Sequence, residues 1–199
     1  MADTLAPKVG LMAAFIHAPL KVLGPGTRVG LWVRGCTLAC EGCLSPELAV
    51  PDKLSLRPVS QVASEMIKLA DKHLAYRVTI SGGEPFQQAV ALKELILLLR
   101  AGGIKDILVY SGYPFKELRV RYPWIERSLS ALVDGPFELA HPTDLAWKGS
   151  EGQKFYLFDP GLKESYDAWL GLKARRLQII PLLEGVLVLG IPKLGDYQG

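Results

Sequence analysis

Three cysteines lie close together in the chain, and their type and spacing are the first sign of a chemistry. Cys36, Cys40 and Cys43 form a C-x3-C-x2-C pattern, and the rest of the sequence has no cysteine. An odd, clustered set is a poor disulfide framework, and in a reducing compartment such thiols are more often metal ligands or catalytic groups. Thiolates suit zinc and iron–sulfur clusters, and three of them leave one position of a four-ligand site open.

A structural zinc site is the first alternative to an iron–sulfur cluster, and a coincidental group of thiols is the second. Structural zinc usually takes a fourth cysteine or histidine at paired spacing. The histidines of the chain, at positions 17, 73 and 141, do not neighbour the cysteines in sequence. The pattern therefore favours an iron–sulfur cluster held by three cysteines.

A second motif, Ser81-Gly82-Gly83-Glu84-Pro85, directly follows a short apolar segment. Two glycines after a strand let backbone approach a ligand, and a glutamate accepts hydrogen bonds from a cationic ammonium group. An ordinary glycine turn followed by Pro85 is the alternative. One helix and one strand are expected between Cys43 and Gly82, as suits neighbouring loops of a βα fold.

Composition limits the class of protein. The 199 residues are 49% hydrophobic and 22% charged, which is typical of a globular chain. The net charge of +3 is too small to indicate a nucleic-acid partner. The longest uncharged stretch, residues 9–20, contains His17 and Pro19, and residues 1–10 lack a basic region. We therefore expect no membrane span and no signal peptide, and a cytoplasmic protein.

The elements that must position these motifs alternate between strands and helices, which predicts βαβ units and a mainly parallel sheet. Both motifs, together with Ser111-Gly112-Tyr113 and Asp134-Gly135, follow expected strands, so four loops should meet at one sheet edge.

Arg28 and Arg34 flank the cysteine strand and are interpreted as solvated strand-end charges rather than ligand contacts. Strands are expected at 28–34, 76–80, 104–110, 130–133 and 155–158, and helices at 58–73, 87–101 and 114–122.

The character of the chain changes after residue 160. Residues 162–175 could form a helix, and residues 177–180 and 185–190 resemble a hairpin. We therefore expect two parts: a main domain over residues 1–160 and a C-terminal helix and hairpin extension over residues 161–199.

Residues 24–28, the apolar strand and the cysteine motif together resemble the radical SAM superfamily, and more narrowly the activating proteins of anaerobic ribonucleotide reductase and related glycyl-radical activases. The resemblance implies an α/β fold with a partial (β/α) barrel of about six mainly parallel strands and flanking helices. It also implies a [4Fe–4S] cluster whose fourth iron is chelated by S-adenosylmethionine (SAM). One electron then cleaves SAM to a 5′-deoxyadenosyl radical, which removes hydrogen from a glycine of a partner enzyme.

The resemblance also assigns residues. Gly82, Gly83, Glu84 and Pro85 match the family's GGEP motif and, together with Gly42 of the cysteine loop, are expected to bind SAM. No acid–base residue is assigned, because the chemistry occurs at the cluster. Position 42, often aromatic beside the adenine, is a glycine here, so another side chain must cover the base. The resemblance extends over residues 24–158. Its later segments supply the expected partner or substrate contacts, Tyr113, Asp134, Phe137, Trp147 and Lys148.

Three functions stay open on these grounds. The first is an activase with a glycyl-radical enzyme as partner and a flavodoxin or ferredoxin as electron donor. The second is a radical SAM enzyme that acts on a small molecule, as the compact deazaguanine-forming synthases do, for which Arg34, Asp134 and Lys148 are candidate polar contacts. The third is a non-catalytic iron–sulfur sensor, which leaves the motif at residues 81–85 unexplained.

Overall fold

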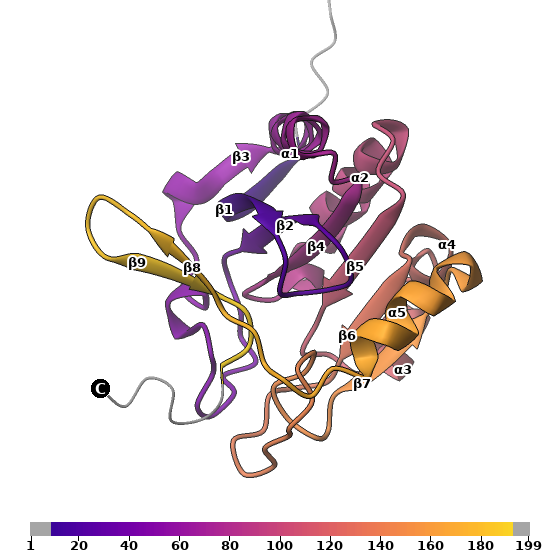
Figure 1. Ribbon diagram of the computed structural model, residues 1–199. Helices are drawn as coiled ribbons and strands as arrows, with labels where there is room; N and C mark the ends of the chain where they lie inside the picture. Colours follow the sequence, from indigo (N-terminus) through magenta and orange to yellow (C-terminus); the bar gives the residue numbers. More distant parts are fainter. Residues whose placement is uncertain (1–8, 193–199) are drawn as a thin grey trace, which may run out of the picture.

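A seven-stranded sheet organises the part of the chain that the computed structural model describes, residues 9–192 (Figure 1). The strand order is β3-β1-β2-β4-β5-β6-β7, which leaves β3 and β7 at opposite edges of an open sheet. The strands are β1 (Gly10–Leu20), β2 (Arg28–Val33), β3 (Leu56–Pro58), β4 (Arg77–Gly82), β5 (Asp106–Tyr110), β6 (Ala131–Asp134) and β7 (Lys154–Leu157).

The expected α/β class is confirmed, but the sheet is less parallel than expected. Strands β2, β4, β5 and β6 are parallel neighbours. The pairs β1–β2, β1–β3 and β6–β7 are antiparallel. The described residues form no closed sheet, so the expected partial barrel is not confirmed, and the expected mainly parallel sheet is corrected to a parallel centre with antiparallel flanks. Only the central strands are joined by helical crossovers, which parallel pairing requires.

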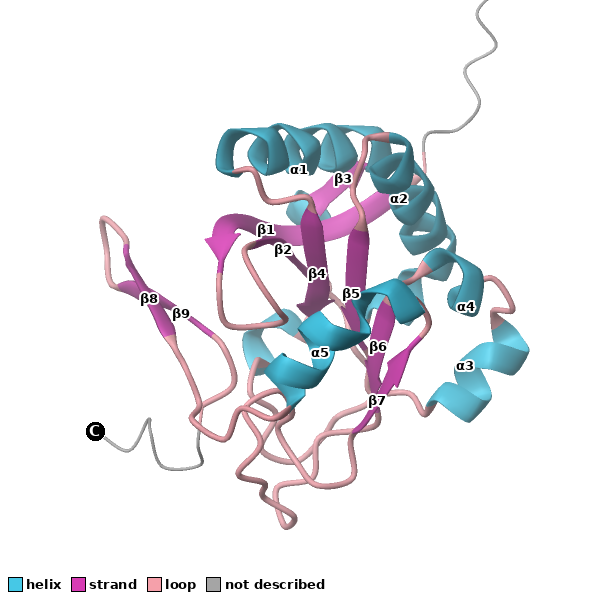
Figure 2. Ribbon diagram, turned by 45° about the vertical axis from the view of Figure 1, so that its right-hand side comes forward, coloured by secondary structure: helices cyan, strands magenta, loops and turns pink. Residues whose placement is uncertain are grey.

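Helices cover both faces of the sheet (Figure 2). One face packs against α1 (Val59–His73), α2 (Ala89–Ala101), α3 (Phe115–Arg121) and α4 (Ile125–Ser128), whose apolar residues form one core with the sheet. The other face, at β5 and β6, packs against α5 (Lys163–Leu170). In β5, Ile107 and Val109 join the first core and Leu108 the second, as the two-residue period of a strand dictates.

Strand β1 was not expected as an element, nor were β3 and α4. The longest uncharged stretch, residues 9–20, forms strand β1. Its Leu11 and Leu20 are fully buried. No helix of residues 9–192 is long and apolar enough to cross a bilayer. Residues 1–8, on which the expectation about a signal peptide partly rests, lie outside the described residues, as do residues 193–199.

The C-terminal extension forms the expected helix and hairpin, although α5 ends at Leu170 rather than near residue 175. Its Tyr166 and Trp169 are buried against β5 and β6. Strands β8 (Gln178–Pro181) and β9 (Val186–Leu189) pair with each other in a separate sheet. Figure 1 shows this hairpin, in yellow, beside β1 and β2.

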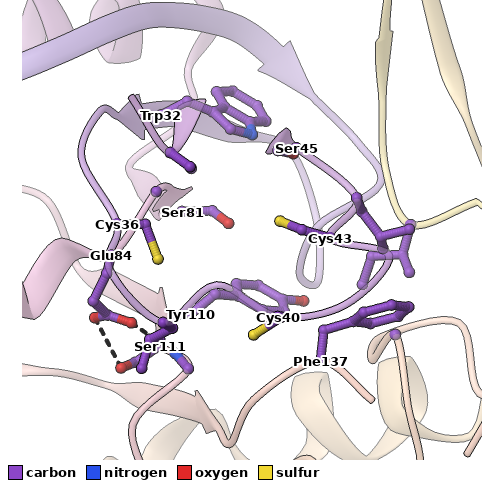
Figure 3. Close-up of a pocket in the computed structure, with 18 of the residues that line it drawn as sticks. Trp32, Cys36, Cys40, Cys43, Ser45, Ser81, Glu84, Tyr110, Ser111 and Phe137 are labelled. Atoms are coloured by element: carbon purple, nitrogen blue, oxygen red, sulfur yellow. Dashed lines mark hydrogen bonds between the residues drawn. The ribbon is translucent and has the colours of Figure 1, made fainter. Parts of the chain in front are cut away.

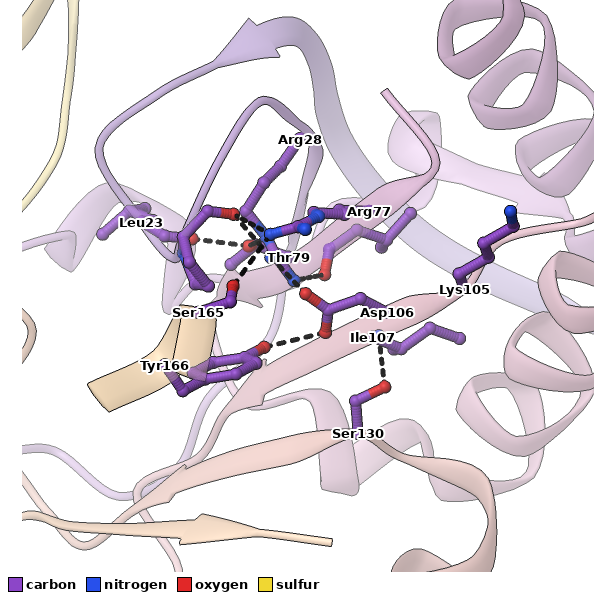
Figure 4. A network of polar contacts seen from close by, with 12 residues as sticks. Leu23, Arg28, Arg77, Thr79, Lys105, Asp106, Ile107, Ser130, Ser165 and Tyr166 are labelled. Atoms are coloured by element: carbon purple, nitrogen blue, oxygen red, sulfur yellow. Dashed lines mark hydrogen bonds and ion pairs between the residues drawn. The ribbon is translucent and has the colours of Figure 1, made fainter. Parts of the chain in front are cut away.

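A buried polar network joins α5 to the centre of the sheet (Figure 4). The Arg28 guanidinium, with none of its surface exposed, lies 2.6 Å from the Asp106 carboxylate and donates to the Thr79 hydroxyl at 2.7 Å. The Tyr166 hydroxyl donates to the other Asp106 oxygen at 2.8 Å. The interpretation of Arg28 as a solvated strand-end charge is therefore wrong, because its charge is paired inside the protein.

Candidate functional site

A pocket lies where the carboxyl ends of the parallel strands meet, as the βα pattern predicts. The cysteine loop follows β2, the glycine motif begins with the last two residues of β4, Ser111 and Gly112 follow β5, and Gly135 follows β6. The pocket is lined by Leu23, Trp32, Cys36, Leu38, Cys40, Cys43, Leu44, Ser45, Ala49, Ser81, Gly82, Gly83, Glu84, Tyr110, Ser111, Gly112, Gly135, Phe137, Gly149, Gln153, Gly190 and Ile191.

The cysteine loop leaves β2 and is held by backbone hydrogen bonds at its start. Gly35 N donates to Leu48 O, and Cys36 N donates to Ala49 O, each at 2.9 Å. The three sulfur atoms point into one common space (Figure 3). All three thiols are free; Cys36 and Cys40 are half-buried, whereas Cys43 is exposed. The pocket therefore holds three soft ligands on one side and is accessible at Cys43.

The thiols fit a cluster better than a single ion. Within residues 9–192, no three Cys, His, Asp or Glu side chains are grouped tightly enough to hold one metal ion. The irons of a cluster each take a separate thiolate, so a cluster does not require that grouping. Burial raises the pKa of the Cys36 thiol, and the nearby Glu84 carboxylate raises it further. Iron held by Cys36, Cys40 and Cys43 would offset both effects, because a coordinated thiol is deprotonated outright.

The two glycines of the second motif are required by contacts within the protein. A Cβ on Gly82, whose φ is +109°, would lie 2.5 Å from the backbone N and O of Val33. A Cβ on Gly83 would lie 2.5 Å from Gly35 O. Gly83 N donates to Val33 O at 2.8 Å, and Glu84 N donates to Gly35 O at 2.9 Å. The glycines thus fix the second loop directly against the start of the cysteine loop.

Glu84 links the second loop to the third. Its Oε1 accepts from Phe86 N and from the Ser111 hydroxyl, both at 2.9 Å, and its Oε2 accepts from Gly112 N at 2.7 Å. The side chain is 1% exposed, and burial raises its pKa while these hydrogen bonds lower it. Sequence reasoning expected a ligand contact and missed this link, since Ser111 and Gly112 are distant in sequence.

Other residues expected at the site are placed differently. Phe137 lines the pocket, whereas Tyr113, Asp134, Trp147 and Lys148 do not. Asp134 accepts from the backbone nitrogens of Phe115 and Lys154.

The remaining three serve the packing around the pocket. Trp147 packs in the second core, and its carbonyl accepts from the Tyr110 hydroxyl at 3.0 Å. Lys148 Nζ lies 2.9 Å from the Glu151 carboxylate. The Tyr113 hydroxyl accepts from Gln87 Nε2 at 2.9 Å.

Two further expected residues lie outside the lining. At Gly42, with φ +67°, a Cβ would meet the Leu139 side chain at 2.8 Å. Pro85 is buried and begins the short 3-10 helix Pro85–Gln88. Sequence reasoning also missed the apolar lining residues Leu23, Trp32, Tyr110 and Ile191. Of these four, only Tyr110 could have been identified from the sequence, because it stands at the end of an expected strand.

Comparison of the sequence with known protein families also indicates an iron–sulfur protein. The family described as a 4Fe-4S single cluster domain matches residues 22–156, a range that contains all three cysteines. The fold and the thiol-lined pocket thus define a single-cluster iron–sulfur domain protein.

The chain is similar to three proteins named anaerobic ribonucleoside-triphosphate reductase-activating protein. That of Enterobacteria phage T4 is 30% identical over 141 residues, covering 68% of this chain and 86% of the relative. That of Escherichia coli K12 is 33% identical over 140 residues (66% and 89%), and that of Vibrio cholerae 33% over 154 residues (71% and 96%). This chain belongs to the family of anaerobic ribonucleoside-triphosphate reductase-activating proteins.

Proposed function

We propose that this protein is a radical SAM activase that installs a glycyl radical on an anaerobic ribonucleotide reductase. The observation that carries the proposal is the shared pocket: the three thiols and the glycine motif, which resembles the SAM-binding motif of that superfamily, line one space. A [4Fe–4S] cluster bound there with SAM supplies one-electron cleavage of the sulfonium and a 5′-deoxyadenosyl radical that takes a hydrogen atom from the partner's glycine.

The chain's own residues bind and orient these groups. Cys36, Cys40 and Cys43 are the iron ligands. The motif Ser81, Gly82, Gly83 and Glu84 lines the same space as these thiols and binds the amino-acid end of SAM, where Glu84 supplies negative charge for the ammonium group. Pro85 supports the motif because it begins the 3-10 helix that follows it. Because the glycines touch the start of the cysteine loop, the two binding elements keep a fixed separation.

The partner is a protein rather than a small molecule. Cys43 is exposed, so the pocket is open where a partner's loop could enter. A small-molecule enzyme needs polar side chains aimed into the pocket, and the three candidates bond elsewhere: Arg34 to Glu47 O, Asp134 to backbone nitrogens, and Lys148 to Glu151. Phe137 lines the pocket and remains a candidate for contact with the partner. A flavodoxin or ferredoxin supplies the electron, and the free thiols suit a reducing cytoplasm.

The test is anaerobic reconstitution with iron and sulfide, followed by reduction with dithionite and addition of SAM. We expect about four irons per chain, 5′-deoxyadenosine as product, and a changed electron paramagnetic resonance spectrum of the reduced cluster on SAM addition. With an anaerobic ribonucleotide reductase present, a glycyl radical signal should form. A cluster that neither binds nor cleaves SAM would support the sensor alternative instead. Cleavage without any radical on the reductase would support a small-molecule substrate.

A further inference from the structure

Two residues of the pocket come from a part of the chain that the family match does not include. The match ends at residue 156, whereas Gly190 and Ile191 line the pocket together with the cysteines. The C-terminal extension therefore contributes directly to the site. In Figure 3 its ribbon, in yellow, runs on the side of the pocket where Cys43 and Ser45 lie.

The hairpin that carries these residues has one inner face and one outer face. In β8 the half-buried Gln178 and Ile180 alternate with exposed residues. In β9, Leu189 is buried in an apolar cluster with Leu20, Trp32 and Leu48. Ile179, on the partner strand, is 64% exposed. This period-two burial indicates that the hairpin is packed against the body of the protein in a defined register.

Polar contacts hold the open end of the hairpin, where β8 begins and β9 ends. At β8, Gln178 Nε2 donates to Pro19 O at 2.8 Å, and Lys21 N donates to Gln178 Oε1 at 3.1 Å. Arg175, which precedes β8, donates from its guanidinium to Pro192 O, beyond β9, at 2.7 Å. It also donates to Thr143 O at 2.6 Å.

The turn at Gly190 can be made only by glycine. Its φ is +121°, and a Cβ there would lie 2.6 Å from Arg176 O. The chain direction that brings Ile191 to the pocket is therefore fixed by this turn and by the contacts of Arg175.

The pocket lining combines two kinds of groups. Leu23, Trp32, Tyr110 and Ile191 all belong to or pack against one apolar cluster. The thiols, Ser81 and Glu84 supply the polar groups of the same lining. A ligand that fits this lining has one charged part and one flat, weakly polar part. In SAM, these are the amino-acid end and the adenosyl group.

We propose that Ile191 is a specificity-determining residue that contacts the adenosyl group of SAM, so that the C-terminal hairpin completes the nucleoside half of the pocket. The inference rests on the proposed function. It also answers how the base is covered in a chain whose position 42 is a glycine that faces Leu139 and supplies no side chain.

The experiment compares two ligands on the reconstituted full-length protein: SAM, and methionine, which has the same amino-acid end without the adenosyl group. Binding is followed by isothermal titration calorimetry with the cluster left oxidised, so that SAM binds but is not cleaved during the titration. We expect Ile191→Ala to weaken SAM binding about 10-fold and Ile191→Val about 3-fold, because each lost methyl or methylene removes apolar contact. Methionine binding should change less than about 2-fold in both variants.

Ile179→Ala is the matched control, since Ile179 is an exposed isoleucine of the same hairpin that does not line the pocket; it should bind both ligands as the wild type does. Equal SAM affinity in wild type and Ile191→Ala would overturn the inference and leave the proposed function standing. An equal loss for SAM and methionine would also overturn it, because that pattern means a disturbed cluster loop. A wild-type protein that holds its cluster but binds no SAM would overturn both.

Discussion

Replacing Glu84 tests whether this carboxylate is a structural link as well as part of a binding site. Glu84→Ala removes the acceptor of two backbone N–H groups, Phe86 and Gly112, and of the Ser111 hydroxyl. Each buried donor left without a partner costs about 1–3 kcal/mol, and relief of the buried carboxylate offsets part of the sum. We expect the free energy of unfolding to fall by about 3 kcal/mol.

Glu84→Gln should have a smaller effect. The amide oxygen can still accept from Phe86 N and Ser111, but the amide nitrogen then faces the donor Gly112 N. We expect a loss of about 1.5 kcal/mol, because one contact is lost rather than three.

The assay is urea unfolding of the protein without iron and without SAM, followed by circular dichroism, so that neither cofactor contributes to stability. Glu65→Ala is the control: its ion pair with Arg57 is partly exposed, with 44% of the Glu65 side chain accessible, and its loss should cost less than about 1 kcal/mol. The reasoning is refuted if the iron-free Glu84→Ala protein is as stable as the wild type. In that case any loss of SAM binding would come from a ligand contact alone.

Three further outcomes are expected. Cys40→Ala should bind no stable cluster after reconstitution, as measured by iron content, because each thiolate holds a separate iron; full iron content would contradict the assignment. Arg28→Ala should lower the free energy of unfolding by about 3–5 kcal/mol, since it leaves the buried Asp106 carboxylate without its charge partner. Burial lowers the pKa of His17 below its ordinary value of 6.5. The neutral imidazole therefore contributes stability above pH 6.5, and this contribution is lost as the pH falls from 6.5 through the lowered pKa. Urea unfolding should show this loss in wild type but not in His17→Ala, where the 3.2 Å contact with Gln178 is absent.

Much of the fold follows from local patterns in the sequence. The helices α1 and α2 and the strands β2, β4, β5 and β6 lie close to where the apolar periodicity places them. The turn residues after these strands then locate the loops, because parallel strands bring their carboxyl ends to one edge. The cysteine spacing needed no structure to indicate iron–sulfur chemistry, since ligand type and number are properties of the residues themselves.

The contacts between distant segments needed the tertiary structure. Strand β1 has no clear alternation, and its register with β2 shifts twice, so local pattern could not predict it. The charge of Arg28 predicts solvent exposure, whereas the structure buries Arg28 in an ion pair with Asp106, which is far away in sequence. Likewise, a glutamate after two glycines suggests a ligand contact, and only the position of Ser111 and Gly112 shows that it also joins two loops.

Ile191 is the clearest case of a site residue that only the tertiary structure could provide. An isoleucine near the end of a hairpin is unremarkable by type and spacing, because apolar side chains carry no chemical signature. The packing of Leu189 and the turn at Gly190 bring it to the pocket. The sequence alone thus predicts which groups are suited to chemistry here, since that depends on residue type. The shape of the space around them depends on long-range packing, which the fold decides.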